Sequence, residues 1–160
     1  MQKLISFIFL FLTVSFIYAQ QKPSNEIIKE GIKLHDEGKY SESVELYKLI
    51  HENDSTYTYM LTELAFTYLQ MGKNDSAIYI TDIALSNLCT TRQNLLQTKA
   101  TAFDNSNQPD KAIEIYSKAI NAYPYYYLLH FNLGVTYLNE ENYPKAVDCF
   151  QNALRNNPFH

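Results

Sequence analysis

A single pattern repeats along this sequence from residue 24 to residue 160. Aligned on recurring residue types, it divides into four blocks of equal length, residues 24–57, 58–91, 93–126 and 127–160, with only Arg92 outside the repeat. A fixed period of about 34 residues is typical of helical solenoids, in which each repeat stacks on the next. Such a chain buries its core between neighbouring repeats instead of in one globule.

Small residues recur at two places in every block. The eighth and twentieth places hold only Gly, Ala or Ser: Gly31, Ala65, Ala100 and Gly134, then Ser43, Ala77, Ala112 and Ala146. Large apolar or aromatic residues follow three places after the first set and four after the second, except at Thr81: Leu34, Tyr68, Phe103 and Tyr137, then Tyr47, Tyr116 and Phe150. This spacing predicts two helices per block that approach closely at the small residues, with the large side chains filling the space beside them.

Breaks between helical segments fall at matching places in the four blocks. They are Glu37-Gly38-Lys39, Met71-Gly72-Lys73-Asn74, Asn105-Ser106-Asn107-Gln108 and Glu140-Glu141-Asn142. Ser41 and Asp75 follow two of these breaks and are predicted N-caps of the second helices, because their side chains accept hydrogen bonds from backbone N–H groups. The sequence therefore predicts an all-α chain of eight helices without a sheet.

The recurring residues resemble those of the tetratricopeptide repeat family, and the resemblance covers everything after the first two dozen residues. The fourth block fits best, with family residue types at Asn132-Leu133-Gly134, Tyr137, Tyr143, Ala146, Phe150, Ala153 and Pro158. The third block departs from the pattern at Lys99 and Pro109, and the second block departs at Thr81 and Cys89. The first block departs most, at Glu30, Ile50 and Ser55. The resemblance implies a right-handed α-solenoid of four helix-turn-helix repeats, in which the irregular first repeat acts as a cap.

In this family, five places on each first helix line a concave groove that binds proteins or peptides. In the second to fourth blocks these places hold Tyr59, Thr62, Phe66, Leu69, Gln70, Asn94, Gln97, Thr101, Asp104, Asn105, Leu128, Phe131, Val135, Leu138 and Asn139. The first block adds Asn25, Ile28, Ile32, His35 and Asp36. The middle of the predicted groove is polar and amide-rich and its last block is apolar, which favours a peptide with a polar stretch and a hydrophobic end.

Some family members hold the acidic tails of heat-shock chaperones with a clamp of Lys, Asn and Arg on three successive first helices. The corresponding places here are Ile28 and Ile32, Glu63, then Asn94 and Thr98, or in the other register Thr62 and Phe66, Thr98, then Leu128 and Asn132. Neither register supplies the cations. We therefore do not expect this chain to capture carboxylates in that way.

The first nineteen residues differ in kind from the repeats. Met1-Gln2-Lys3 carries one positive charge, residues 4–18 are apolar apart from two serines and a threonine, and Ala19-Gln20 offers a cleavage point. This is the layout of a secretory signal peptide, and the apolar stretch is short for a membrane span of about 20 residues. The alternative is an uncleaved membrane anchor, because Ile17 is larger than the residue usually found there. We expect an exported chain, periplasmic or secreted, that touches a membrane only if this segment is retained.

Charge and composition exclude several classes of function. The formal net charge is −4, and removing residues 1–19 takes away Lys3 and no acid, giving −5, which argues against a nucleic-acid partner. The four histidines belong to no metal-binding spacing, and no Gly-rich phosphate loop is present. Cys89 and Cys149 are expected to be buried free thiols, with a disulfide as the alternative. The sequence therefore predicts no catalytic residue, no cofactor, no metal site and no enzyme activity.

Two aromatic or apolar features have more than one interpretation. The run Tyr123-Pro124-Tyr125-Tyr126-Tyr127 either staples the third repeat to the fourth or offers rings to a partner. Val147, Phe150, Leu154 and Phe159 have no following helix to cover them, so they contact another subunit or partner, or the sequence is a piece of a longer protein. His130, at a core position of a first helix, is expected to be a partly buried ring.

These observations together predict an exported tetratricopeptide repeat scaffold that mediates protein–protein interaction through its concave groove. The alternative is an input or sensor module of a longer or membrane-anchored signalling protein. Retention of the N-terminal segment would favour that alternative.

Overall fold

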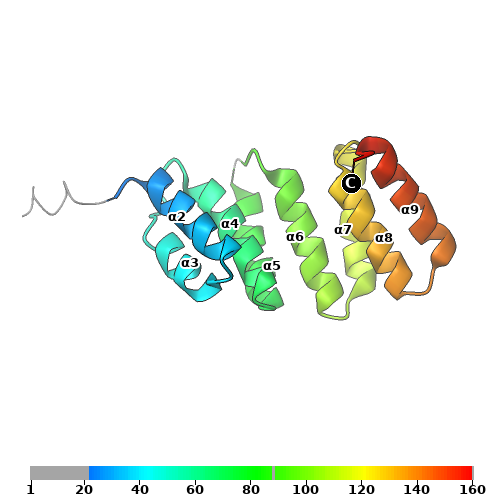
Figure 1. Ribbon diagram of the computed structural model, residues 1–160, viewed down its shortest axis with the longest axis horizontal. Helices are drawn as coiled ribbons and strands as arrows, with labels where there is room; N and C mark the ends of the chain where they lie inside the picture. Colours follow the sequence, from blue (N-terminus) through cyan, green and yellow to red (C-terminus); the bar gives the residue numbers. More distant parts are fainter. Residues whose placement is uncertain (1–21, 88, 160) are drawn as a thin grey trace, which may run out of the picture.

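The computed structural model describes residues 22–87 and 89–159, so the predicted signal peptide lies outside the described residues. Within these ranges the chain forms eight helices and no strand: α2 (Ser24–Asp36), α3 (Tyr40–Tyr47), α4 (Tyr57–Gln70), α5 (Asn74–Ser86), α6 (Arg92–Asn105), α7 (Pro109–Ala122), α8 (Tyr127–Asn139) and α9 (Tyr143–Asn156). They follow one another as four pairs along the length of an elongated molecule (Figure 1). The predicted all-α chain of eight helices is confirmed.

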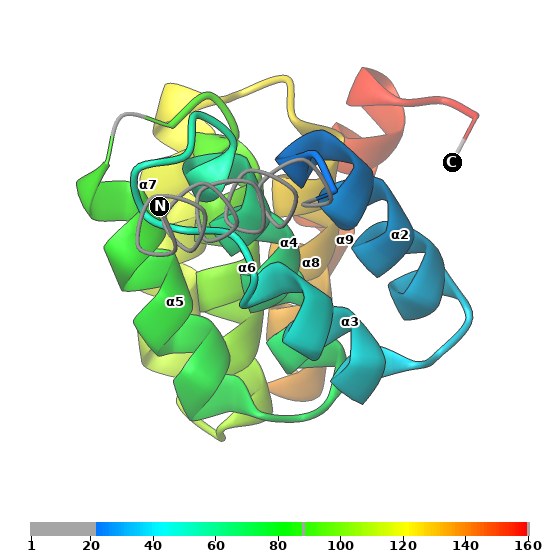
Figure 2. The same cartoon turned by 90° about the vertical axis from the view of Figure 1, so that its left-hand side faces the viewer.

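The first helices of the four pairs form an inner row, and the second helices form an outer row. Successive first helices contact one another, α2 with α4, α4 with α6 and α6 with α8, whereas no such contact joins the second helices across the described ranges. The second helices α3, α5 and α7 each pack instead against the first helix of the next pair. Figure 2 looks along this double row from the end formed by α2 and α3. Because the first helices lie closer together, the array curves around them and they line its concave side.

Every first helix ends in the same hydrogen-bonded turn. A backbone N–H beyond the helix bonds to a carbonyl five residues earlier: Lys39 to Leu34 at 2.8 Å, Lys73 to Tyr68 at 2.9 Å, Gln108 to Phe103 at 3.0 Å and Asn142 to Tyr137 at 2.8 Å. The residue before each donor has a positive φ: Gly38 at 76°, Gly72 at 69°, Asn107 at 57° and Glu141 at 57°. This is the Schellman pattern of helix ends, for which Gly and then Asn are best suited. All four turns lie within the predicted breaks.

The prediction that Ser41 and Asp75 are N-caps is wrong. The helices begin one residue earlier, α3 at Tyr40 and α5 at Asn74, and lysines without a side-chain capping bond occupy the cap positions. The reason is the preceding turn, which directs the chain straight into the second helix. Asp75 lies instead in the first turn of α5, where a negative charge interacts favourably with the helix dipole.

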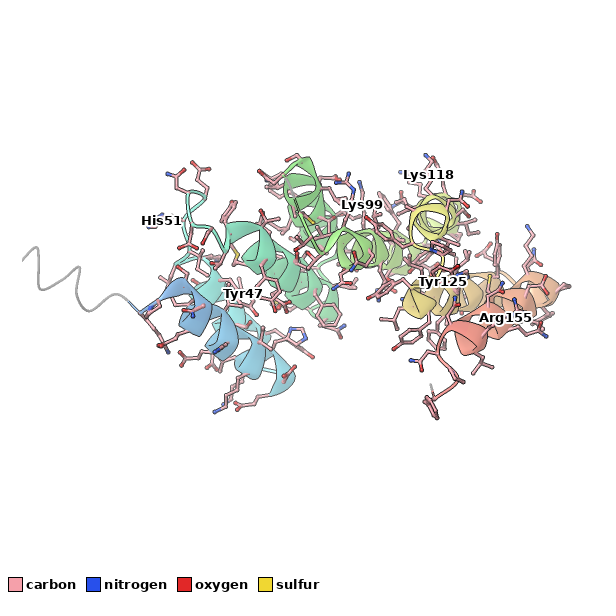
Figure 3. The ribbon with its side chains drawn as sticks, turned by 90° about the horizontal axis from the view of Figure 1, so that it is seen from above. Tyr47, His51, Lys99, Lys118, Tyr125 and Arg155 are labelled. Atoms are coloured by element: carbon pink, nitrogen blue, oxygen red, sulfur yellow. The ribbon has the colours of Figure 1, made fainter. Side chains whose placement is uncertain are left out.

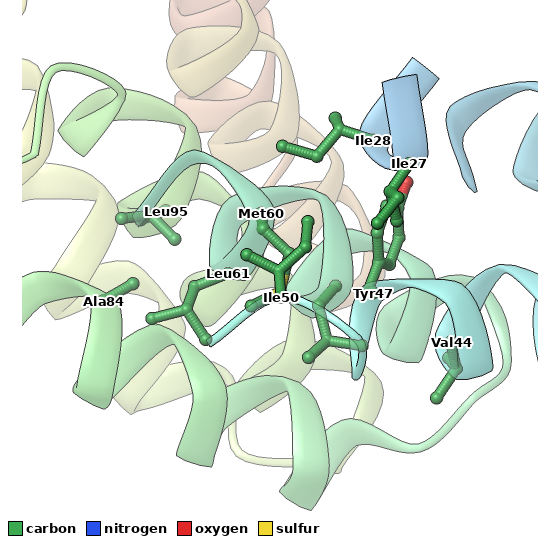
Figure 4. Packing of buried hydrophobic residues seen from close by; sticks show 10 residues of the cluster. Ile27, Ile28, Val44, Tyr47, Ile50, Met60, Leu61, Ala84 and Leu95 are labelled. Atoms are coloured by element: carbon green, nitrogen blue, oxygen red, sulfur yellow. The ribbon is translucent and has the colours of Figure 1, made fainter. Parts of the chain in front are cut away.

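Rings fill the space between paired helices at the small residues of the repeat. Tyr47 is fully buried, and a Cβ atom added to Gly31 would lie 2.3 Å from Cε1 of its ring. Gly134 meets Phe150 in the same way, at 2.7 Å. Figure 4 shows Tyr47 beside Ile27, in an apolar cluster that extends from α2 to α6. The small residues therefore allow the close helix contact that the spacing predicts.

The aromatic run between the third and fourth repeats mainly packs these two repeats against each other. Tyr123 and Tyr126 pack against the apolar cluster that joins α6, α7 and α8, whereas Tyr125 is 83% exposed. The Pro124 carbonyl accepts two hydrogen bonds, from His130 Nε2 at 2.8 Å and from Asn156 Nδ2 at 3.0 Å. His130 is thus more deeply buried than expected, at 9% exposure, and it ties the connecting segment to α8.

Both cysteines are free, as predicted, but Cys89 and Cys149 are half-buried instead of fully buried. Among the described residues, none of the helices has the length and apolar character needed to cross a membrane.

Candidate protein-binding groove

A hollow of about 270 Å³ lies at the middle of the concave side, between the inner helices α4, α6 and α8. Eight side chains line this central hollow: Thr62, Glu63, Phe66, Asn94, Gln97, Thr98, Tyr126 and Leu128. Five of them are residues that the sequence predicts for the groove. The other three are Glu63, Thr98 and Tyr126.

The sequence already assigns Glu63 and Thr98 to clamp places on the first helices, and helical spacing puts both of them beside the predicted groove residues. Glu63 lies four residues after Tyr59 and three before Phe66, so these three side chains share one helix face. Thr98 occupies the same place in the third block as Glu63 does in the second. Tyr126 is harder to predict, because it lies outside the first helices and reaches back to the groove from the segment before α8.

Hydrogen bonds fix the polar side chains of the central hollow. The Tyr126 hydroxyl donates to Asn94 Oδ1 at 2.8 Å, which leaves the amide N–H groups of Asn94 available to a partner's carbonyl. The Thr62 hydroxyl donates to the Thr58 carbonyl at 3.1 Å, so Thr91 must be the donor in its 2.8 Å bond to Thr62 Oγ1. The bonds of Tyr126 and Thr91 connect a first helix to the segment that leads into the next repeat, and they hold the hollow in a defined shape.

At the α2 end of the groove, the ring of His35 stacks on Phe66, with ring centroids 4.9 Å apart and planes inclined by 24°. Its Nδ1 lies 2.9 Å from Thr67 Oγ1. The Thr67 hydroxyl donates to the Glu63 carbonyl at 2.8 Å, so His35 Nδ1 is the donor in this pair. Burial lowers the pKa of His35 and so favours the neutral ring, although the negative charge of Asp36 opposes this effect. Phe66 is thus held in place on one side, and the residue as a whole is 39% exposed.

The contact between His35 and Thr67 has an equivalent two repeats further along. There the Thr136 hydroxyl donates to Asp104 Oδ2 at 3.0 Å. Between α4 and α6, the matching places hold Leu69 and Ala102, which belong to one buried apolar cluster. Leu69 is only 9% exposed, so it joins two repeats more than it lines the groove surface.

The remaining predicted groove residues differ in exposure. Exposed on the inner helices are Tyr59, Gln70, Asn105, Leu138 and Asn139, and half-buried are Thr101, Asp104, Phe131 and Val135. In the first repeat, Ile28 is buried in the core at 2% exposure, Asn25 and Asp36 are exposed, and Ile32 and His35 are half-buried.

A second, smaller hollow of about 170 Å³ lies between α8 and α9. Its lining is wholly apolar or aromatic: Tyr127, Phe131, Phe150, Ala153 and Leu154. The rings of Phe131 and Phe150 lie 5.7 Å apart and are tilted by 52°. This second hollow lies between the two helices of the last repeat and is apolar, whereas polar side chains predominate in the lining of the central hollow.

Glu63 is the one acidic side chain that lines the central hollow. Burial raises the pKa of Glu63, although a hydrogen bond from Tyr59 opposes this effect, and the negative charge of Asp36 raises it further. No group of three or more His, Cys, Asp or Glu side chains in residues 22–87 and 89–159 is arranged to hold a metal ion.

Comparison with known families and sequences agrees with this architecture. Residues 94–126 and 127–160 each match a family model described as a tetratricopeptide repeat. The chain is also similar to a Photosystem I assembly protein, Ycf3, of Prochlorococcus marinus (strain MIT 9215). The two are 28% identical over 128 residues, which cover 70% of this chain and 74% of the relative.

Solved structures share the fold at low sequence identity. The crystal structure of MamA gives a TM-score of 0.70 at 22% identity, covering 89% of this chain and 82% of that chain. A thermophilic tetratricopeptide repeat protein of Thermus thermophilus gives 0.73 at 17% identity, covering 85% and 75%. A MamA structure from Desulfovibrio magneticus RS-1 gives 0.68 at 16% identity, covering 83% and 75%. The fold is an α-solenoid of tetratricopeptide repeats, a class that generally mediates protein–protein interaction.

Proposed function

We propose that this chain is an exported scaffold that holds a segment of a partner protein in its concave groove. The central hollow carries this proposal, because it combines an exposed ring, Phe66, with the amide groups of Asn94 and Gln97 on one surface. Repeat solenoids present such concave surfaces to extended partners. A bound segment would place its backbone on the amides and an apolar side chain on the ring.

The printed name of the sequence relative supports a role in assembly. Ycf3 of Prochlorococcus marinus is named a Photosystem I assembly protein. By analogy, we assign this chain the task of holding a protein segment while a larger complex forms. The alternative role as the input module of a signalling protein gains no support from the relatives found.

The groove proposal predicts that two aromatic truncations remove its partners. Phe66→Ala combined with Phe131→Ala removes one ring from each hollow, at one exposed and one half-buried position. We expect affinity capture with this variant to lose the partners that wild type retains. A matched control is Tyr79→Ala, which removes a 65% exposed ring from the outer helix α5. Identical partner sets for wild type and the double variant would refute the groove proposal.

A second pair of substitutions tests the exposed apolar face of the last helix, α9. Val147 and Leu154 are 52% and 53% exposed on α9, and Phe159 beyond it is 99% exposed. We propose that this face contacts a second copy or a further partner, since exposed apolar patches usually mark contacts. Val147→Ser with Leu154→Ser should then change the molar mass in light scattering or remove partners that the groove variant retains. No change in either measurement would count against this contact.

Export predicts a specific mass for the mature chain. Produced with its own N-terminus in a bacterial host that exports proteins, the chain should reach the envelope or medium and begin at Gln20. Intact-mass spectrometry of that material gives the answer. An envelope-bound chain that retains residues 1–19 would support the uncleaved anchor, and a chain confined to the cytoplasm would contradict export altogether.

A further inference from the structure

The central hollow contains a carboxylate without a cationic partner. Glu63 lies on its wall beside Phe66, and no Lys or Arg of the described residues forms an ion pair with it. Taking a carboxylate out of water is unfavourable unless an opposite charge compensates it. The neighbouring hydroxyl of Tyr59 interacts with this carboxylate but carries no positive charge. A cation placed beside the Glu63 carboxylate would therefore stabilise this part of the groove.

The surrounding groove has the same sign of charge. Asp36 and Asp104 are the other charged residues among the groove positions, and Lys and Arg are absent from them. The lysine of α6, Lys99, is already paired with Asp82 of α5. A partner with a positive charge would thus meet only attraction along this surface, which increases its rate of association and its selectivity.

The size of the hollow suits one side chain. At about 270 Å³ it falls below the roughly 300–1,000 Å³ typical of sites for whole small molecules. A long side chain with an apolar stem and a charged end uses both kinds of surface present, because its stem packs on a ring while its end meets the carboxylate. A cation near the exposed face of Phe66 gains further from the ring quadrupole.

We propose that the central hollow receives a lysine or arginine side chain of the partner segment, with Glu63 as its counter-ion and Phe66 as the surface for its stem. This rests on the proposed groove function and deepens it. The amide N–H groups of Asn94 would hold the adjoining backbone, since the carbonyl oxygen of that side chain is engaged by Tyr126. The partner is thus a basic segment, in contrast to the acidic tails bound by clamps of lysine and arginine.

Peptide selection tests this proposal with the full-length chain. The probe is a phage-displayed library of random dodecapeptides, followed by the most enriched peptide made with a fluorescent label. We expect the enriched sequences to share a Lys or Arg next to an apolar residue. The Kd of the labelled peptide should rise about tenfold or more in Glu63→Gln, which keeps the shape of the side chain and removes its charge.

A matched control is Glu114→Gln on α7, which removes an exposed carboxylate paired with Lys118. Figure 3 shows Lys118 at the outer edge of the array, so this change should leave the Kd unaltered. Replacing the cation of the peptide by norleucine should weaken binding to wild type and have little further effect on Glu63→Gln, because both changes remove the same pair.

The possible failures are distinguishable. Peptides that bind without a cation, or that bind Glu63→Gln as well as wild type, would overturn the basic-segment proposal. If Phe66→Ala still abolished their binding, the groove function itself would stand. Enrichment of no peptide above a support without the chain would count against both proposals.

Discussion

Replacing Tyr116 with Ala should destabilise the fold by about 3–5 kcal/mol, the range for truncating an enclosed aromatic ring. Tyr116 is 1% exposed and belongs to a cluster with Ala100, Ala119 and Leu129. These residues come from α6, α7 and α8, so the lost contacts weaken one repeat and its junction with the next. Because the chain has no Trp, the free energy of unfolding is best followed in urea by far-ultraviolet circular dichroism.

Tyr116→Phe separates the ring from its hydroxyl. The Tyr116 hydroxyl donates to Thr101 Oγ1 at 2.7 Å, since the Thr101 hydroxyl itself donates to the Gln97 carbonyl at 3.0 Å. Removing this bond while keeping the ring should cost about 1 kcal/mol. If the Phe and Ala variants lost equal stability, the hydrogen bond and not the packing would be the source of the effect.

The fold could be predicted from sequence because one helix-pair geometry recurs in every repeat. Where α8 and α9 approach closely, Gly134 lies opposite the ring of Phe150, and the two residues occur at a fixed spacing that can be recognised in the sequence. The N-caps could not be predicted in the same way. A polar residue signals a helix start, but the turn at Gly38 already determines where the chain enters α3.

The sequence predicts which positions line the candidate groove better than it predicts what each side chain contacts there. Leu69 occupies a groove place, yet it packs between repeats because its neighbour there is Ala102, whereas His35 at the matching place finds Thr67. Each place thus meets a different partner in the next repeat. Glu63 illustrates the same limit, since only the assembled groove shows that no Lys or Arg of residues 22–87 and 89–159 pairs with its carboxylate.

Gly31→Ala should destabilise the first repeat although Ala favours a helix over Gly. A Cβ atom there would lie 2.3, 2.8 and 3.0 Å from Cε1, Cζ and Cδ1 of Tyr47, and this fully buried ring has no room to move aside. Overpacking costs about 1–3 kcal/mol, against a gain of about 1 kcal/mol in helix propensity. Because the Tyr47 ring cannot move aside, we expect the cost to lie in the upper part of this range and the net loss to reach about 2 kcal/mol, measured by urea unfolding.

Gly134→Ala is the matched comparison, because it brings a Cβ atom to 2.7 Å from Phe150, a half-buried ring that can swing outward. Its net effect should be within about 1 kcal/mol of zero. The second repeat carries Ala65 and Thr81 at the places of Gly31 and Tyr47. Gly31→Ala should therefore be tolerated in a Tyr47→Thr background. If Gly31→Ala lost as much stability in the Tyr47→Thr background as in wild type, contact with the Tyr47 ring would not be the reason for a glycine at this position. Full stability of the single variant Gly31→Ala would lead to the same conclusion.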